Sequence, residues 1–171
     1  MKNNIVIIGF MATGKTSVAR YLANELGKKY ISTDEMIVKK VNKAINLIFE
    51  EEGEIRFREL EIEVIKAISK MDNLVVDCGG GIVLNWINVA RLQEKGIIIL
   101  LTASVEQILE RSASSPERPL LNVQDAKEKT TELLRFRKPF YERAADVSID
   151  TTNLKVNDIV SRILEIVKAK D

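Results

Sequence analysis

A glycine-rich segment near the N-terminus has the residue types and spacing of a phosphate-binding loop. Residues 9–16 read GFMATGKT and match the pattern G-x-x-x-x-G-K-[ST], between a predicted strand and a predicted helix. Its backbone amides and the helix dipole would hold phosphate oxygens, Lys15 would reach the β- and γ-phosphates, and the Thr16 hydroxyl would bind Mg²⁺. The residues predicted to bind ATP or GTP here are Ala12, Thr13, Gly14, Lys15, Thr16 and Ser17.

A second glycine-rich segment follows an apolar run. Residues 75–83 read VVDCGGGIV, so an acid ends the run and three consecutive glycines follow. In an open α/β sheet, ligands bind beyond the carboxyl ends of the strands. We therefore expect the bare backbone of Gly79, Gly80 and Gly81 to approach a second substrate beside the γ-phosphate. The alternative is an ordinary glycine-rich turn before the next helix.

The elements that must position these segments alternate along the chain. Leu22 and Leu26 have the spacing of a helix that Gly27 ends, and residues 33–70 favour helix with a break at Gly53. This alternation predicts an α/β fold in three layers, with an open parallel sheet between helices, in a single domain of residues 1–171. The predicted strands are 5–8, 29–32, 74–76, 97–101 and 147–149, and the other predicted helices are 104–110, 125–136 and 156–167.

Composition excludes several classes of function. Lys and Arg number 26 against 25 Asp and Glu, so no net field attracts nucleic acid or an anionic membrane. The chain has no histidine, which disfavours serine-triad chemistry and zinc sites, and a single cysteine fits a reducing cytoplasm. The apolar run at 97–101 is too short to span a bilayer. We expect a cytoplasmic protein without a nucleic-acid or membrane partner.

One polar segment stands apart from this alternation. Residues 112–122 read SASSPERPLLN, small and proline-punctuated, between two predicted helices. The segment is either a plain surface loop or a mobile lid over the nucleotide.

In its order of motifs the chain resembles the shikimate kinases over nearly its whole length. The segments that carry the resemblance are GFMATGKT at 9–16, STD at 32–34, FRELE at 57–61, GGG at 79–81, RPLL at 118–121 and RKPFYERAAD at 137–146. The resemblance implies a P-loop fold like that of the nucleoside monophosphate kinases, with five parallel strands, a shikimate-binding region at 33–61 and a lid at 112–124. It also implies ATP-dependent phosphorylation of the 3-hydroxyl of shikimate, a step toward chorismate and the aromatic amino acids. We expect the protein to be a monomer.

The resemblance assigns roles that agree with the chemistry of the substrate. Arg58 and Arg137 match the positions of a carboxylate clamp, which calls for planar bidentate cations. Asp34 matches the group that accepts the hydrogen bond of the attacking hydroxyl. Arg118 would stabilise the transferring phosphoryl group, and Arg111 would stack on adenine. The predicted catalytic residues are Lys15, Asp34 and Arg118, and the predicted substrate contacts are Asp34, Arg58, Gly79, Gly80, Gly81 and Arg137.

The sequence departs from the family pattern in two places. Ser32 stands where these kinases usually carry an acid associated with magnesium. We expect Asp77, at the end of its apolar strand, to replace that acid beside Thr16, although it could instead only orient the glycine turn. The loop at 151–158 lacks the proline that often accompanies the adenine-side arginine.

Three other functions remain open from the sequence. Gluconate kinases share this fold and also bind a hydroxylated acid. Nucleoside monophosphate kinases fit less well, because Asp34 would face an anionic acceptor. A P-loop module that binds nucleotide without transferring phosphate would explain the acid missing at Ser32.

Overall fold

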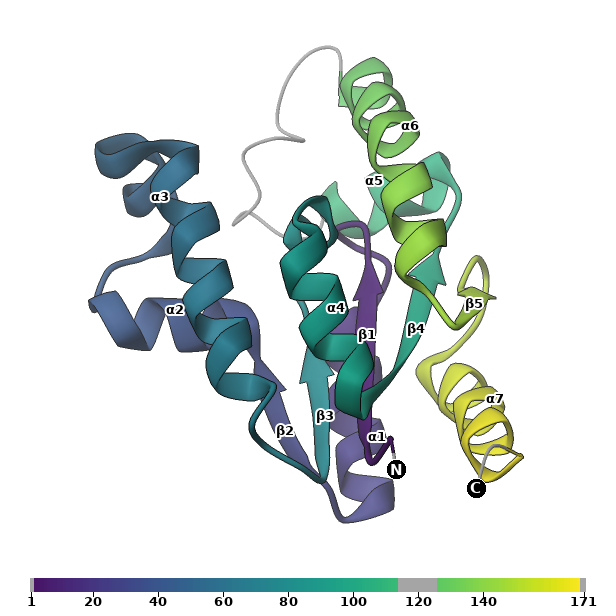
Figure 1. The fold of residues 1–171 in the computed structure, drawn as a ribbon. Helices are drawn as coiled ribbons and strands as arrows, with labels where there is room; N and C mark the ends of the chain where they lie inside the picture. Colours follow the sequence, from purple (N-terminus) through teal and green to yellow (C-terminus); the bar gives the residue numbers. More distant parts are fainter. Residues whose placement is uncertain (1, 114–125, 170–171) are drawn as a thin grey trace.

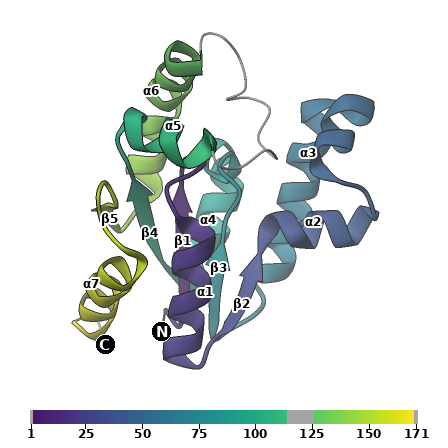
Figure 2. The ribbon, with the colours of Figure 1, turned by 180° about the vertical axis from the view of Figure 1, so that it is seen from behind.

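Five parallel strands form the centre of the protein, and helices cover both faces of this sheet (Figures 1 and 2). The computed structural model describes residues 2–113 and 126–169. The strands are β1 (Asn4–Gly9), β2 (Lys29–Ser32), β3 (Leu74–Asp77), β4 (Gly96–Thr102) and β5 (Val147–Asp150). The helices are α1 (Lys15–Leu26), α2 (Thr33–Val41), α3 (Ile45–Ile68), the 3₁₀ turn η1 (Ile82–Leu84), α4 (Trp86–Lys95), α5 (Val105–Ala113), α6 (Ala126–Ala144) and α7 (Val156–Lys168).

The strand order is β2-β3-β1-β4-β5, which places β1 at the middle of the sheet. All six residues of β1 are buried, because alternate side chains enter two different cores. Ile5 and Ile7 pack with α1 and α7 on one face. Val6 and Ile8 pack with α3, α4 and α6 on the other. The predicted three-layer α/β fold with a parallel sheet is therefore confirmed.

Glycine ends or interrupts two helices where the sequence predicts it. Gly27, at φ 60°, caps α1, and Gly53, at φ 82°, breaks the regular geometry inside α3. Both φ values lie in the left-handed region that glycine adopts without strain. The pair α2–α3 stands to one side of the sheet, opposite α6 (Figures 1 and 2). It contains most of the predicted 33–61 region.

The predicted end of a helix at Phe136 is wrong. The helix α6 continues to Ala144, with Pro139 inside it. Proline removes one backbone donor and is unfavourable within a helix. Here Tyr141 and Ala144 are buried in the core beyond the proline, and this packing holds the last turns in helical form.

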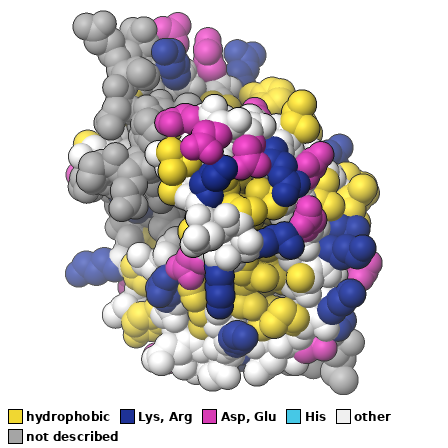
Figure 3. Space-filling model, turned by 90° about the vertical axis from the view of Figure 1, so that its left-hand side faces the viewer, with side chains coloured by type: hydrophobic (Ala, Val, Ile, Leu, Met, Phe, Trp, Pro, Cys, Tyr) yellow, Lys and Arg dark blue, Asp and Glu magenta, His cyan; other side chains and the backbone are white. Residues whose placement is uncertain are grey.

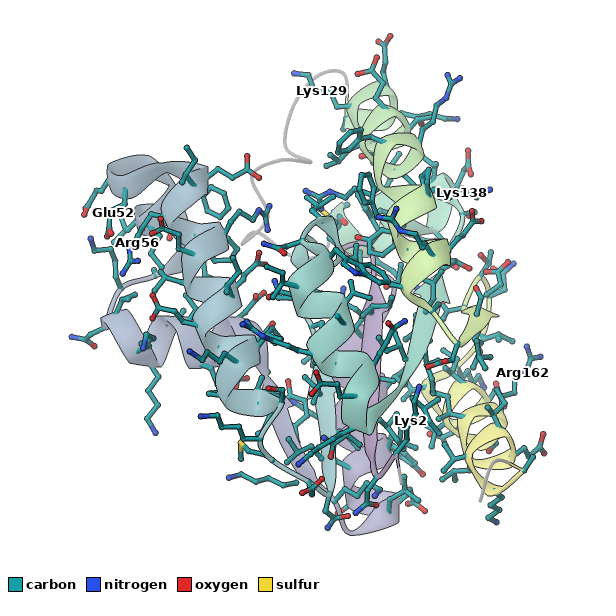
Figure 4. All side chains as sticks on the ribbon, in the orientation of Figure 1. Lys2, Glu52, Arg56, Lys129, Lys138 and Arg162 are labelled. Carbon is teal, nitrogen blue, oxygen red and sulfur yellow. The ribbon has the colours of Figure 1, made fainter. Side chains whose placement is uncertain are left out.

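Charges of both signs cover the surface around α2 and α3. Figure 3 shows lysine, arginine and acidic side chains interspersed on this face. Ion pairs such as Lys40–Glu63, at 3.1 Å, account for part of the pattern. In Figure 4, the labelled Lys138 and Arg162 project outward from α6 and α7. Among residues 2–113 and 126–169, no helix is both long and apolar enough to cross a bilayer.

Candidate functional site

The loop between β1 and α1 has the backbone of a phosphate cradle. Gly9 has a φ of 148°, and a side chain there would overlap the carbonyl of Leu101 on the neighbouring strand. Gly14, at φ 92°, is the residue before the first turn of α1. Thr13 is buried and donates to the carbonyl of Phe10 (2.8 Å), and the Lys15 ammonium donates to the same oxygen (2.9 Å). The loop thus presents the N-terminus of α1 and a lysine at one point, which suits an anion.

A carboxylate from β3 lies directly against this loop. The Thr16 hydroxyl donates to Asp77 Oδ2 at 2.7 Å, and the Tyr30 hydroxyl donates to the same oxygen at 3.2 Å. Burial, followed by the negative charge of Asp77, raises the pKa of Tyr30 to about 12. Ser32 pairs with Asp77 in the sheet, but its hydroxyl accepts the Glu35 amide and caps α2.

These oxygens fit a magnesium ion. A hydroxyl and a carboxylate are the hard ligands that Mg²⁺ prefers, and phosphate oxygens usually complete its coordination. The described part of the chain contains no cluster of three or more acidic, cysteine or histidine side chains that could hold a metal. Thr16 and Asp77 supply one hydroxyl and one carboxylate oxygen of this kind, in contact at 2.7 Å.

Polar side chains of the protein come close to the three glycines at 79–81. A Cβ at Gly79 would lie 2.5 Å from Asp34 Oδ1, and one at Gly81 would overlap the Arg58 guanidinium. A Cβ at Gly80 would lie 3.6 Å from both Arg137 Nη1 and the Gly9 carbonyl oxygen. The turn therefore lies beside the three polar side chains predicted for the substrate and beside Gly9 of the phosphate loop.

Arg58 is held by two acids on its own helix. Its Nη1 donates to Glu61 Oε2 at 2.7 Å, and its Nη2 and Nε donate to Glu54 Oε1 at 2.8 and 3.1 Å. The Glu61 side chain is 1% exposed. Burial raises the pKa of Glu61 to about 7, although the nearby Arg58 cation lowers it. Asp34 and Arg137 also act on this carboxyl group, so the four side chains share one electrostatic environment.

The nucleotide side of the site is a cleft of about 390 Å³ beside the phosphate loop. Its lining residues are Thr13, Gly14, Ser17, Val18, Arg111, Leu154, Lys155, Val156 and Ile159. Arg111 donates to the carbonyl of Ala12 (3.3 Å) and to the hydroxyl and carbonyl of Thr151 (3.1 and 2.9 Å). The buried Thr151 thus ties the loop after β5 to Arg111.

The structure brings together most of the predicted site residues. Asp34, Arg58, Arg137 and the glycine turn form one cluster, and the phosphate loop with Asp77 adjoins it. Arg118 and residues 114–124 of the predicted lid lie outside the described residues.

Sequence reasoning assigned no role to four residues that contact the site. These are Tyr30, Glu61, Tyr141 and Thr151. Two of them had a usable signal, because Glu61 follows Arg58 by three positions and Tyr141 follows Arg137 by four. Residues at these spacings lie on one face of a helix.

Comparisons with known proteins show the family to which the chain belongs. The sequence model of the shikimate kinase family matches residues 11–168. A shikimate kinase of Thermodesulfovibrio yellowstonii is 43% identical over 162 residues, which cover 95% of this chain and 93% of the relative. A shikimate kinase of Thermoanaerobacter pseudethanolicus is 39% identical over 162 residues, 95% of this chain and 94% of the relative.

Solved structures show the same relationship. Shikimate kinase from Acinetobacter baumannii, in complex with shikimate, has a TM-score of 0.93 and 34% identity, covering 99% of this chain and 94% of that one. Shikimate kinase from Aquifex aeolicus has a TM-score of 0.85 and 31% identity, covering 98% and 97%.

Proposed function

The chain belongs to the shikimate kinase family, and from this premise we propose how its own residues perform the reaction. The enzyme transfers the γ-phosphoryl group of ATP to the 3-hydroxyl of shikimate, in the biosynthesis of aromatic amino acids. The observation that supports this most is that Asp34, Arg58, Arg137 and Gly9 of the phosphate loop all lie close to one glycine turn. A carboxylate that suits a substrate hydroxyl (Asp34) and two guanidinium groups that suit a substrate carboxylate (Arg58 and Arg137) thus lie beside the phosphate-binding loop.

Each side chain of this cluster has a task that its chemistry suits. Arg58 and Arg137 bind the carboxylate of shikimate, which fixes the ring. Asp34 accepts the hydrogen bond of the attacking hydroxyl and orients it toward the phosphoryl group. Lys15 and the N-terminus of α1 stabilise negative charge on the phosphate oxygens. Cytoplasmic location and a monomeric state stay predictions.

Thr16 and Asp77 are the proposed residues for Mg²⁺. Their hydroxyl and carboxylate oxygens are already in contact at 2.7 Å. A bound magnesium ion would neutralise charge on the β- and γ-phosphates. Tyr30 and Thr16 hold the Asp77 carboxylate in place for this role.

A coupled assay of ADP formation tests the function. The protein should release ADP rapidly with shikimate, and only at background rate with gluconate or a nucleoside monophosphate. A fast reaction with gluconate and a slow one with shikimate would show that gluconate is the acceptor. Tight ATP binding without turnover on any of the three would instead indicate a nucleotide-binding module.

Replacing the arginines should act on shikimate and not on ATP. We expect Arg137→Ala to raise KM for shikimate by about 10- to 100-fold, since a hydrogen bond to a charged group contributes about 1.5–3 kcal/mol. Arg58→Ala should do the same, but it also leaves the buried Glu61 carboxyl without its cation. Steady-state kinetics with each substrate varied in turn measures both effects.

Arg143→Ala is the matched control for this experiment, because Arg143 lies on the same helix and packs over the Trp86 ring. Its KM values should match those of the unaltered protein. If Arg137→Ala raised the KM for ATP as much as that for shikimate, Arg137 would not belong to a carboxylate clamp.

Asp77→Asn should raise the Mg²⁺ concentration needed for half-maximal activity. The substitution keeps size and hydrogen bonding but removes the charge that favours a divalent cation. Adding Ser32→Asp should return this Mg²⁺ concentration to that of the unaltered protein, because residue 32 pairs with residue 77 in the sheet. The exposed Asp72, which pairs with Lys95, provides the control Asp72→Asn. An unchanged requirement in Asp77→Asn would reduce Asp77 to a residue that orients the turn.

A further inference from the structure

The backbone hydrogen bonds of the glycine turn are almost fully accounted for. The Gly79 amide donates to the Thr33 hydroxyl at 2.8 Å. The carbonyls of Gly79 and Gly81 accept from the amides of Ile82 (3.2 Å) and Leu84 (3.1 Å), the first and last residues of the 3₁₀ turn η1. The Gly80 carbonyl accepts from the Tyr141 hydroxyl at 2.6 Å. All three carbonyls are therefore in use.

Two amides of the turn remain. Within residues 2–113 and 126–169, no hydrogen bond is made by the N–H of Gly80 or Gly81. Gly81 is nevertheless buried. Native proteins pair nearly all buried backbone N–H groups, so an unpaired one in a candidate site points to a ligand atom.

Tyr141 determines the direction of one of these donors. The chain has no cis peptide bond among its described residues, so the Gly80 carbonyl and the Gly81 N–H point to opposite sides of one planar peptide. The carbonyl points to Tyr141 on α6. The Gly81 N–H must then point away from the Tyr141 hydroxyl. Asp34 lies close to Gly79, and the Arg58 guanidinium lies close to Gly81.

The hydroxyl of Tyr141 is well suited to fix this peptide. Tyr141 is 3% exposed, so few other orientations are open to its ring. Burial raises its pKa to about 12, although the adjacent Arg137 lowers it, so the phenol keeps its proton at neutral pH. A Cβ on Gly80 would lie 3.6 Å from the Tyr141 hydroxyl and 3.6 Å from Arg137 Nη1. The helix α6 therefore places both the tyrosine and a residue of the carboxylate clamp beside Gly80.

We propose that Tyr141 is a positioning residue for the acceptor, which holds the Gly80–Gly81 peptide so that the Gly81 N–H donates to an oxygen of the substrate. Tyr141 does not touch the substrate in this arrangement. It acts through the peptide, and without its hydroxyl the peptide can rotate and withdraw the donor. The inference rests on the proposed function, because the acceptor it names is shikimate.

Tyr141→Phe tests the proposal, since it removes the hydroxyl and keeps the buried ring. We expect the Kd for shikimate, measured by calorimetry, to rise about threefold to tenfold, which is the scale of one hydrogen bond. The Kd for ATP should not change. Tyr21→Phe is the matched control, because Tyr21 is 41% exposed on α1, and it should bind both ligands normally.

The amide proton of Gly81 gives a readout that a purely structural role would not move. In the unaltered protein its NMR resonance should shift downfield when shikimate is added, and this shift should shrink in Tyr141→Phe. A full shift in the variant, or equal losses for shikimate and ATP with a lowered Tm, would overturn the proposal. If the unaltered protein failed to bind shikimate, the proposed function itself would fail, and the inference with it.

Discussion

Lys15→Ala should lower kcat by about 10²- to 10³-fold, the scale seen when one preorganised group that stabilises transition-state charge is removed. Lys15 stands at the first position of α1, where its ammonium and the helix N-terminus act on the same phosphate oxygens. The charge on these oxygens is redistributed as the phosphoryl group moves. The loss should therefore appear in kcat more than in the KM for shikimate.

The ammonium of Lys15 also donates to the carbonyl of Phe10, so its removal could loosen the loop. Circular dichroism and thermal unfolding of the variant separate this effect from lost catalysis. Lys39→Ala, on the exposed surface of α2, is the control and should keep normal turnover. A folded Lys15→Ala protein with near-normal kcat would refute the assignment of residues 9–16 as the site of the transferring phosphate.

Asp34→Asn should lower kcat by about 10²- to 10⁴-fold, the range attributed to a positioned acid or base. Asparagine keeps the size of the side chain but cannot accept the proton of the attacking hydroxyl. Asp34 lies in the first turn of α2, and its carboxylate lies beside Gly79. The KM for shikimate should change little, because the two arginines still bind the carboxylate.

The adjacent residue gives a matched control for Asp34. Glu35 is exposed and pairs with Arg20 at 2.6 Å, so Glu35→Gln removes a charge one position away without touching the glycine turn. It should leave kcat unchanged. If Asp34→Asn raised the KM for shikimate while kcat stayed normal, Asp34 would bind the substrate without acting on the hydroxyl proton.

The sequence by itself determined the features that depend on neighbouring residues. The P-loop, the alternation of strands and helices, and the glycines at 27 and 53 could all be recognised from it. Local backbone preferences and side-chain periodicity control these features, and both are written in short windows of sequence. The resemblance to a family then placed Asp34, Arg58 and Arg137 in one site.

Only the tertiary structure decided which polar groups meet. Thr16 contacts Asp77 because β1 and β3 are neighbours in the sheet, and those two residues are 61 positions apart. Arg111 donates a hydrogen bond to Thr151, 40 positions away. The sequence of the loop at 151–158 did not predict this contact. Such contacts follow from strand order and helix packing, which no short window specifies.

The same reason explains the error at Phe136 and the role missed at Tyr141. Proline is unfavourable within a helix, but burial of the residues beyond Pro139 outweighs that local preference and extends α6 past Phe136. This burial brings the Tyr141 hydroxyl to the Gly80 carbonyl, 61 positions away. The sequence determined that three glycines follow β3. The fold decided which side chains lie beside them, because only packing brings α2, α3 and α6 to the end of this strand.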